Sequence, residues 1–222
     1  MALNAAEEET IEALKKWWDE NGKQLVLIVI AVLTGYTSWM FWQNNQSSAV
    51  ESASDIYEEI LVLAATEPGA LVTEEERAEI IDLSSRLIAD HSGSIYAQYG
   101  ALFAAQQHVS DNDLDAAENS LQWIIDNPRD GLFTDDDEGL MLTAGLRLGR
   151  IVLAKGEADR ALGIVNNLDP KAFEGGFAEL RGDIYVEMDR FLDARDSYVA
   201  AQQAGSNSDS LRMKLDELPD DS

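Results

Sequence analysis

The side chains of this chain offer few combinations that could carry out chemistry. The two histidines, His91 and His108, do not fall in a recognisable metal-ligand spacing, and there is no cysteine to act as a nucleophile or thiolate ligand. No Ser/His/Asp set stands out for nucleophilic catalysis. We therefore predict no catalytic residue and no enzyme. The alternative, an enzyme with an unrecognised active site, would require a cleft of convergent acids with perturbed pKa values.

Two acidic stretches have the oxygen ligands that divalent cations prefer. Residues 111–115 begin like a calcium-binding loop, but Ala116 replaces the required glycine and Gln122 replaces the bidentate glutamate. We interpret these residues as the turn and N-cap between two helices. Residues 135–138 are four consecutive acids, which we place in a solvated acidic loop over 130–139. We predict no metal site and no cofactor.

Glycine placement also argues against a phosphate-binding loop. Such a loop follows a β-strand, and no segment shows the sustained alternation of a strand. Gly145 and Gly149 are four residues apart in an expected helix of the soluble part, where small residues allow close helix packing.

The most regular feature is a unit that occurs three times. The windows Ala104–Leu121, Leu148–Val165 and Arg181–Tyr198 align without gaps. Each window has four corresponding positions: a small residue (Ala105, Gly149, Gly182), a turn residue (Asn112, Gly156, Asp189), an alanine twelve residues after the small one (Ala117, Ala161, Ala194), and a large side chain four residues later (Leu121, Val165, Tyr198). Two antiparallel helices approach closely only where both carry small side chains, and the large residue fills the space beside that contact.

This unit resembles the tetratricopeptide repeat, most clearly in Gly182 with Tyr185 and in Ala194 with Tyr198. The spacing from Ala161 to Ala194 is close to the family's repeat length of about 34 residues. The first two units are further apart, and we assign the extra residues to the 130–139 loop. We predict an all-α fold with an N-terminal transmembrane helix and a tetratricopeptide-like α-solenoid.

Helices are also expected outside the three units. Residues 47–66 and 74–89 predict two helices of a degenerate unit upstream. Residues 210–218 place Leu211, Leu215 and Leu218 on one face, which predicts a capping helix over the last repeat. The four prolines, at 68, 128, 170 and 219, stand where helices should stop.

Residues 25–42 form an uncharged apolar run long enough to cross a bilayer as a helix of roughly 27 Å. Trp17 and Trp18 precede the run, whereas Trp39 and Trp42 close it, as expected for rings at the two headgroup layers. We assign a transmembrane helix to residues 24–42. A buried core helix would carry a polar face, and this run has none.

A cleaved signal peptide is the second alternative, with small residues at Ser47 and Ala49. The run is longer than the usual ~7–15 residues of a signal peptide and ends in bulky aromatic residues. An uncleaved anchor is therefore the better interpretation.

The distribution of Lys and Arg sets the expected orientation. Lys15, Lys16 and Lys23 precede the run, and no further cation occurs before Arg77. The positive-inside rule then places residues 1–23 in the cytoplasm and residues 43–222 outside. We therefore predict a single-pass type II membrane protein with its N-terminus in the cytoplasm.

The charge of the soluble part excludes some partners. Of the formal net charge of −26, residues 43–222 carry −23. Such a surface disfavours nucleic acid, which needs clustered Lys and Arg, and it repels anionic lipid headgroups. High solubility, or adaptation to a salty habitat, accounts for the charge. An acidic groove would favour basic stretches of a partner polypeptide, with strong salt dependence.

Taken whole, the chain resembles the YfgM-like family of ancillary SecYEG translocon subunits. The resembling segments are Ile11–Leu25, the span ending in SWMFWQ, Ser94–Val109, Ala178–Tyr185 and Leu211–Leu218. The strong acidity and the 130–139 loop depart from the family pattern, so no individual binding residue is carried over.

The resemblance implies one span in the bacterial inner membrane and a periplasmic tetratricopeptide-like domain over residues 43–222. It implies association with the SecYEG translocon and the periplasmic chaperone PpiD, and help in passing exported polypeptides to periplasmic chaperones. Two alternatives share the anchor and the repeats: a scaffold subunit of another envelope complex, and a regulator of an envelope stress pathway acting through residues 1–23.

Overall fold

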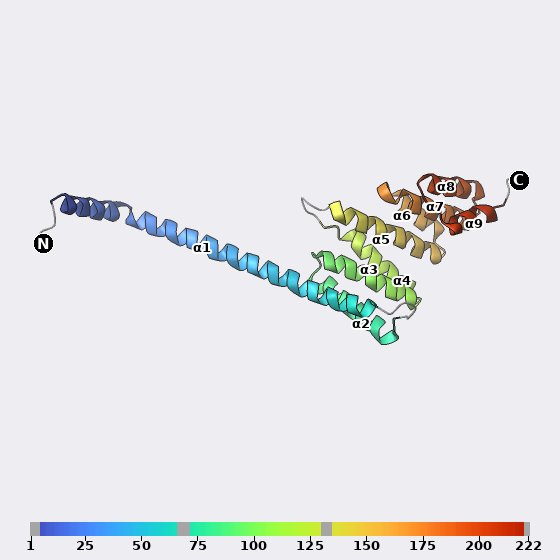
Figure 1. Ribbon diagram of the computed structural model, residues 1–222, viewed down its shortest axis with the longest axis horizontal. Helices are drawn as coiled ribbons and strands as arrows, with labels where there is room; N and C mark the ends of the chain where they lie inside the picture. Colours follow the sequence, from blue (N-terminus) through green and yellow to red (C-terminus); the bar gives the residue numbers. More distant parts are fainter. Residues whose placement is uncertain (1–4, 66–71, 130–134, 220–222) are drawn as a thin grey trace. The chain divides into compact units, whose positions relative to one another are not determined.

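The computed structural model describes the backbone of residues 5–65, 72–129 and 135–219, which form helices and no strand (Figure 1). It divides into two compact units, residues 1–51 and 52–222. The helices are α1 (Ala5–Ala64), α2 (Glu74–Asp90), α3 (Ile95–Ser110), α4 (Leu114–Asp126), α5 (Asp135–Ala154), α6 (Ala158–Asn166), α7 (Glu174–Glu187), α8 (Phe191–Gln203) and α9 (Asp209–Glu217), with a 3₁₀ turn, η1, at Lys171–Phe173. The all-α prediction is confirmed.

Helix α1 contains the apolar run, and the described side chains of this run are exposed. Its candidate membrane-spanning stretch is Thr10–Phe41, and none of the most apolar window is buried. The hydroxyls of Thr34 and Thr37 donate to the carbonyls of Ile30 and Leu33, so these polar side chains are satisfied within their own helix. A helix of this length and composition fits a single membrane span.

One expected boundary is absent. The sequence predicts a separate helix over 47–66, but these residues up to Ala64 are the C-terminal part of α1. No proline or glycine stands between Gln43 and Ala64 to end the helix. The second upstream helix is confirmed as α2, where Thr73 and Glu76 form a capping box at the N-terminus.

Helices α3 to α8 form the three predicted pairs, each joined by the same type of turn. Asn112, Gly156 and Asp189 have φ angles of 58°, 79° and 56°. In each turn the N–H of the next residue donates to the carbonyl five residues earlier: Asp113 to His108 at 2.8 Å, Glu157 to Val152 at 3.1 Å and Arg190 to Tyr185 at 2.8 Å. The left-handed residue thus ends one helix in a Schellman-type cap and reverses the chain.

The small residues of the repeat lie at the helix–helix contacts, as predicted. Ala117, Ala161 and Ala194 are fully buried. A Cβ placed on Gly182 would overlap the ring of Tyr198, which is itself buried and donates its hydroxyl to Asp183 at 2.8 Å. The glycine on one helix and the large residue on its partner therefore occupy one shared space.

Each helix packs on its neighbour along the chain, and the buried residues form three connected cores. The first joins α2 and α3 to the end of α1, with Ile60 and Ile80 fully buried. The second extends from α3 to α7. The third is closed by α9, where Leu211 is fully buried, which confirms the predicted capping helix.

The acidic loop predicted for residues 130–139 is partly wrong. Helix α5 begins at Asp135, so residues 135–139 are helical. Acidic side chains are favoured in the first turn of a helix because of the helix dipole, which explains four acids at this helix start. Residues 130–134 lie outside the described residues, as does Pro68. The other three prolines follow α4, α6 and α9, as expected.

The contact between Gly182 and Tyr198 can be tested by Gly182→Ala. The added methyl group must displace a buried ring, so we expect the free energy of unfolding to fall by about 1–3 kcal/mol. Gly163→Ala is the control, because Gly163 is exposed on α6 and its added Cβ meets nothing. That change should stabilise the chain by about 0.5–1 kcal/mol through helix propensity. Denaturant unfolding of the full chain in mild detergent measures both, and equal effects would contradict the packing.

Candidate binding groove

A groove lies between α3 and α5, with a cavity volume of about 430 Å³. Helix α4 packs against both helices. The groove floor is formed by the buried side chains of Ala105 from α3, Leu121 from α4 and Ile151 from α5. The other lining residues are Gln106, Val109, Ser110, Arg147 and Arg150. We call this the α3–α5 groove; it has an apolar floor and a polar rim.

The rim of the α3–α5 groove is positively charged. Arg147 and Arg150 are exposed, one helical turn apart on α5, and the described residues that line the groove include no carboxylate. Neither arginine forms an ion pair or hydrogen bond with the residues that the structure describes. The expectation of an acidic groove is therefore wrong for this groove, and basic segments are not its matching ligands.

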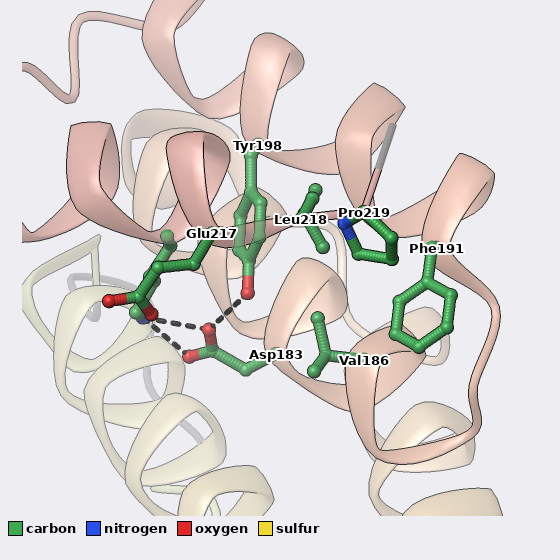
Figure 2. A pocket seen from close by; sticks show the side chains of 8 residues that line it. Asp183, Val186, Phe191, Tyr198, Glu217, Leu218 and Pro219 are labelled. Atoms are coloured by element: carbon green, nitrogen blue, oxygen red, sulfur yellow. Dashed lines mark hydrogen bonds and ion pairs between the residues drawn. The ribbon is translucent and has the colours of Figure 1, made fainter. Parts of the chain in front are cut away.

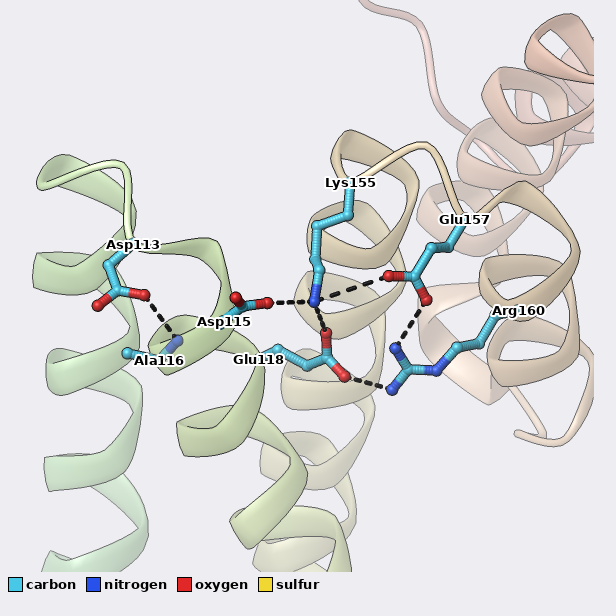
Figure 3. Close-up of polar contacts among 7 residues, drawn as sticks. All are labelled: Asp113, Asp115, Ala116, Glu118, Lys155, Glu157 and Arg160. Carbon is cyan, nitrogen blue, oxygen red and sulfur yellow. Dashed lines mark hydrogen bonds and ion pairs between the residues drawn. The ribbon is translucent and has the colours of Figure 1, made fainter.

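A cluster of ion pairs connects α4 with α6 and the turn before it (Figure 3). Glu118 on α4 accepts from both Lys155, at 2.7 Å, and Arg160. Lys155 also pairs with Asp115, and Arg160 pairs with Glu157 at 3.0 Å. The cluster fixes two neighbouring repeat units to each other by charge, in addition to their shared apolar core.

The hydrogen bonds of this cluster favour the ionised forms of Glu118 and Lys155. Hydrogen bonds from Arg160 and Lys155 lower the pKa of Glu118, despite partial burial of its carboxylate. The hydrogen bonds to Asp115 and Glu118 raise the pKa of Lys155. Both acid and base are therefore charged throughout the physiological pH range.

A second pocket, of about 380 Å³, lies where α9 meets α7 and α8 (Figure 2). The Tyr198 hydroxyl points at the Asp183 carboxylate, as Figure 2 shows. Lys214 of α9 also reaches Asp183, at 2.7 Å, and Glu179, at 2.9 Å. This network attaches the capping helix to α7. We interpret it as structural, because its polar groups are already paired.

Burial and the Asp183 hydrogen bond raise the pKa of Tyr198, so its hydroxyl stays protonated and remains a donor. Burial alone would lower the pKa of Lys214, but its bonds to Asp183 and Glu179 outweigh this effect and raise it. Lys214 of α9 therefore stays charged over a wide pH range.

The residues considered for cation binding have other partners. Asp111 pairs with Arg77 at 2.7 Å, and the Asp113 side chain accepts from the Ala116 N–H as the N-cap of α4. This confirms the turn and N-cap interpretation. His91 is the C-cap residue of α2, and His108 lies half-buried in the last turn of α3. Within the described ranges, no three acids or histidines come together as a metal site.

Comparison with known proteins agrees with this architecture. The chain matches a family model described as a tetratricopeptide repeat-like domain over residues 15–220. A Haemophilus influenzae protein named ancillary SecYEG translocon subunit is 30% identical over 220 residues, covering 98% of this chain and 100% of the relative. The chain belongs to the family of ancillary SecYEG translocon subunits. No solved structure matches it.

Other members of the ancillary translocon subunit family match over similar lengths. The Escherichia coli K12 protein is 26% identical, covering 98% of this chain and 99% of its own, and the Neisseria gonorrhoeae protein is 26% identical, covering 98% and 100%. Both carry the same name as the Haemophilus protein. The family consists of non-enzymatic adaptors, and this chain is accordingly not an enzyme.

The ion-pair cluster predicts a pH-dependent contribution from Glu118. Because its pKa is lowered on folding, the stabilisation is present above the unfolded-state pKa of about 4.3 and is lost as pH falls through the folded-state value. Glu118→Gln should cost about 1–2 kcal/mol at pH 7, since Lys155 and Arg160 keep other acidic partners.

The free energy of unfolding of the full chain, measured in mild detergent between pH 7 and pH 3, tests this. The difference between wild type and variant should shrink as the pH falls below about 5. Glu187→Gln, at an exposed acid of α7, is the control and should have little effect. A difference that stays constant across the pH range would show that the carboxylate charge is not responsible.

Proposed function

We propose that the chain is a membrane-anchored adaptor at the SecYEG translocon, with residues 1–23 in the cytoplasm, 24–42 in the membrane and 43–222 in the periplasm. Similarity to proteins named ancillary SecYEG translocon subunits over nearly its full length carries the proposal. The exposed apolar stretch in α1 supports an anchor. In this role the repeat domain passes newly exported polypeptides to periplasmic chaperones, among them PpiD.

The membrane anchor raises the local concentration of the repeat domain near its partners, so contacts of low affinity are sufficient for this role. A domain fixed within tens of ångströms of a translocon exit experiences an effective concentration of roughly millimolar. Adaptor contacts that release their client readily are then sufficient. The three cations before the span and the long cation-free stretch after it support the proposed orientation.

The orientation can be tested with single cysteines, because the native chain has none. Ser92→Cys lies at an exposed position after α2, and Glu12→Cys lies in residues 1–23, before the proposed membrane segment 24–42. A membrane-impermeant maleimide added to intact spheroplasts should label Ser92→Cys at once, and Glu12→Cys only after lysis by detergent. The opposite labelling pattern would place the repeat domain in the cytoplasm.

The partner assignment can be tested by photo-crosslinking of the full chain in bacterial membranes. A crosslinking amino acid at Val29 in the span should capture a SecYEG subunit, and one at Val109 in the repeat domain should capture exported chains or PpiD. The control replaces residues 24–42 by an unrelated apolar span with the same flanking lysines. Capture of other envelope proteins in place of SecYEG subunits would instead support the scaffold alternative.

A further inference from the structure

We propose that the α3–α5 groove binds a segment of a partner polypeptide that carries a carboxylate beside an apolar side chain. The inference stands apart from the translocon assignment, because it rests on the residues of the groove alone. It also reverses the expectation of basic clients that the overall acidity suggests.

The charge on the groove rim is the first argument. The chain has 42 acids for 16 cations, and several of its described arginines, such as Arg77 and Arg160, pair with a carboxylate. Arg147 and Arg150 instead stand one turn apart, unpaired among the described residues, where their like charges repel. A carboxylate placed between them would accept charge-assisted, bidentate hydrogen bonds from planar guanidinium groups.

The floor supplies the second part of the recognition. Ala105, Leu121 and Ile151 line it and are buried, and Val109 at its side is 46% exposed. A cavity of about 430 Å³ falls within the range of ligand-binding pockets. An apolar side chain beside the bound carboxylate would cover Val109 and remove apolar surface from water. The combined pattern fits an acidic, amphipathic peptide.

The chain already contains one example of such binding. Asp183 on α7 occupies the repeat position that Arg150 occupies on α5. A helix that brings a cation covers it: Lys214 of α9 pairs with Asp183, and Leu211 of α9 is buried in the core shared with α7 and α8. In the earlier unit the charge at this position is inverted, so the matching side chain must be acidic.

Other anionic ligands are disfavoured by the remainder of the surface. A nucleic acid or an anionic bilayer presents an extended array of phosphates, and residues 43–222 carry a formal charge of −23. A single peptide segment brings only its local charges to the groove. A polypeptide is therefore the class of partner that the electrostatics allow.

The test uses the full chain in nanodiscs of zwitterionic lipid and a short fluorescent amphipathic peptide made of Leu and Glu. We expect this peptide to bind more tightly than a matched Leu and Gln peptide. Arg147→Gln with Arg150→Gln should weaken binding by about tenfold or more, because charge-assisted hydrogen bonds are lost. Arg147→Lys with Arg150→Lys should retain an intermediate affinity, since the charge remains without the planar fork.

Arg86→Gln with Arg212→Gln is the matched control, because it removes two exposed cations elsewhere and gives the same net charge. It should change the affinity by less than about twofold. Equal weakening by both double variants, equal binding of the two peptides, or no binding of the Glu peptide would overturn the proposal. So would displacement of the peptide by phosphatidylglycerol vesicles, or a change in sedimentation that assigns the groove to a second copy of the chain.

Discussion

The close approach of two antiparallel helices is the constraint on which the repeat domain depends. Each approach needs a residue at positive φ to reverse the chain and a small residue where the helices meet. Asn112, Gly156 and Asp189 meet the first need, and residues such as Gly182 meet the second. Because these features recur at the same offsets, the pairs stack in the same way, and the α3–α5 groove is a product of that stacking.

The acidic surface is organised by a small number of shared cations. Lys155, directly after α5, pairs with Asp115 and Glu118 of α4. Lys214 of α9 pairs with Glu179 and Asp183 of α7, so each cation connects its own segment to another helix. Such networks reduce self-repulsion where units meet, whereas the remaining acids face water and keep the domain soluble. Arg147 and Arg150 lie outside these networks and have no partner in the described part of the chain, and they stand together on the rim of one groove, which suits them to hold a ligand.

Sequence reasoning found the repeats because their determinants are local. The turn at Gly156, the helix contact at Ala161 and the N-cap at Asp113 are each determined by residues close to them in the sequence. The groove could not be predicted in this way, because its floor and rim come from three helices whose relative positions depend on tertiary packing. The spacing of Arg147 and Arg150 around Gly149 was the available signal. The net negative charge of the chain instead predicts an acidic groove, which has the opposite sign.

Affinity and tethering place complementary demands on such a groove. Two exposed arginines and an apolar floor can hold a carboxylate and one apolar side chain. These contacts are sufficient for selectivity, but they give only a modest affinity in free solution. In the proposed role, a domain attached beside its partners by α1 does not need more, because confinement supplies the missing concentration. Tight binding would oppose the release of clients that this proposed role requires. The combination of a strong anchor with a small, charged groove is therefore physically consistent with repeated, short-lived contacts at a membrane.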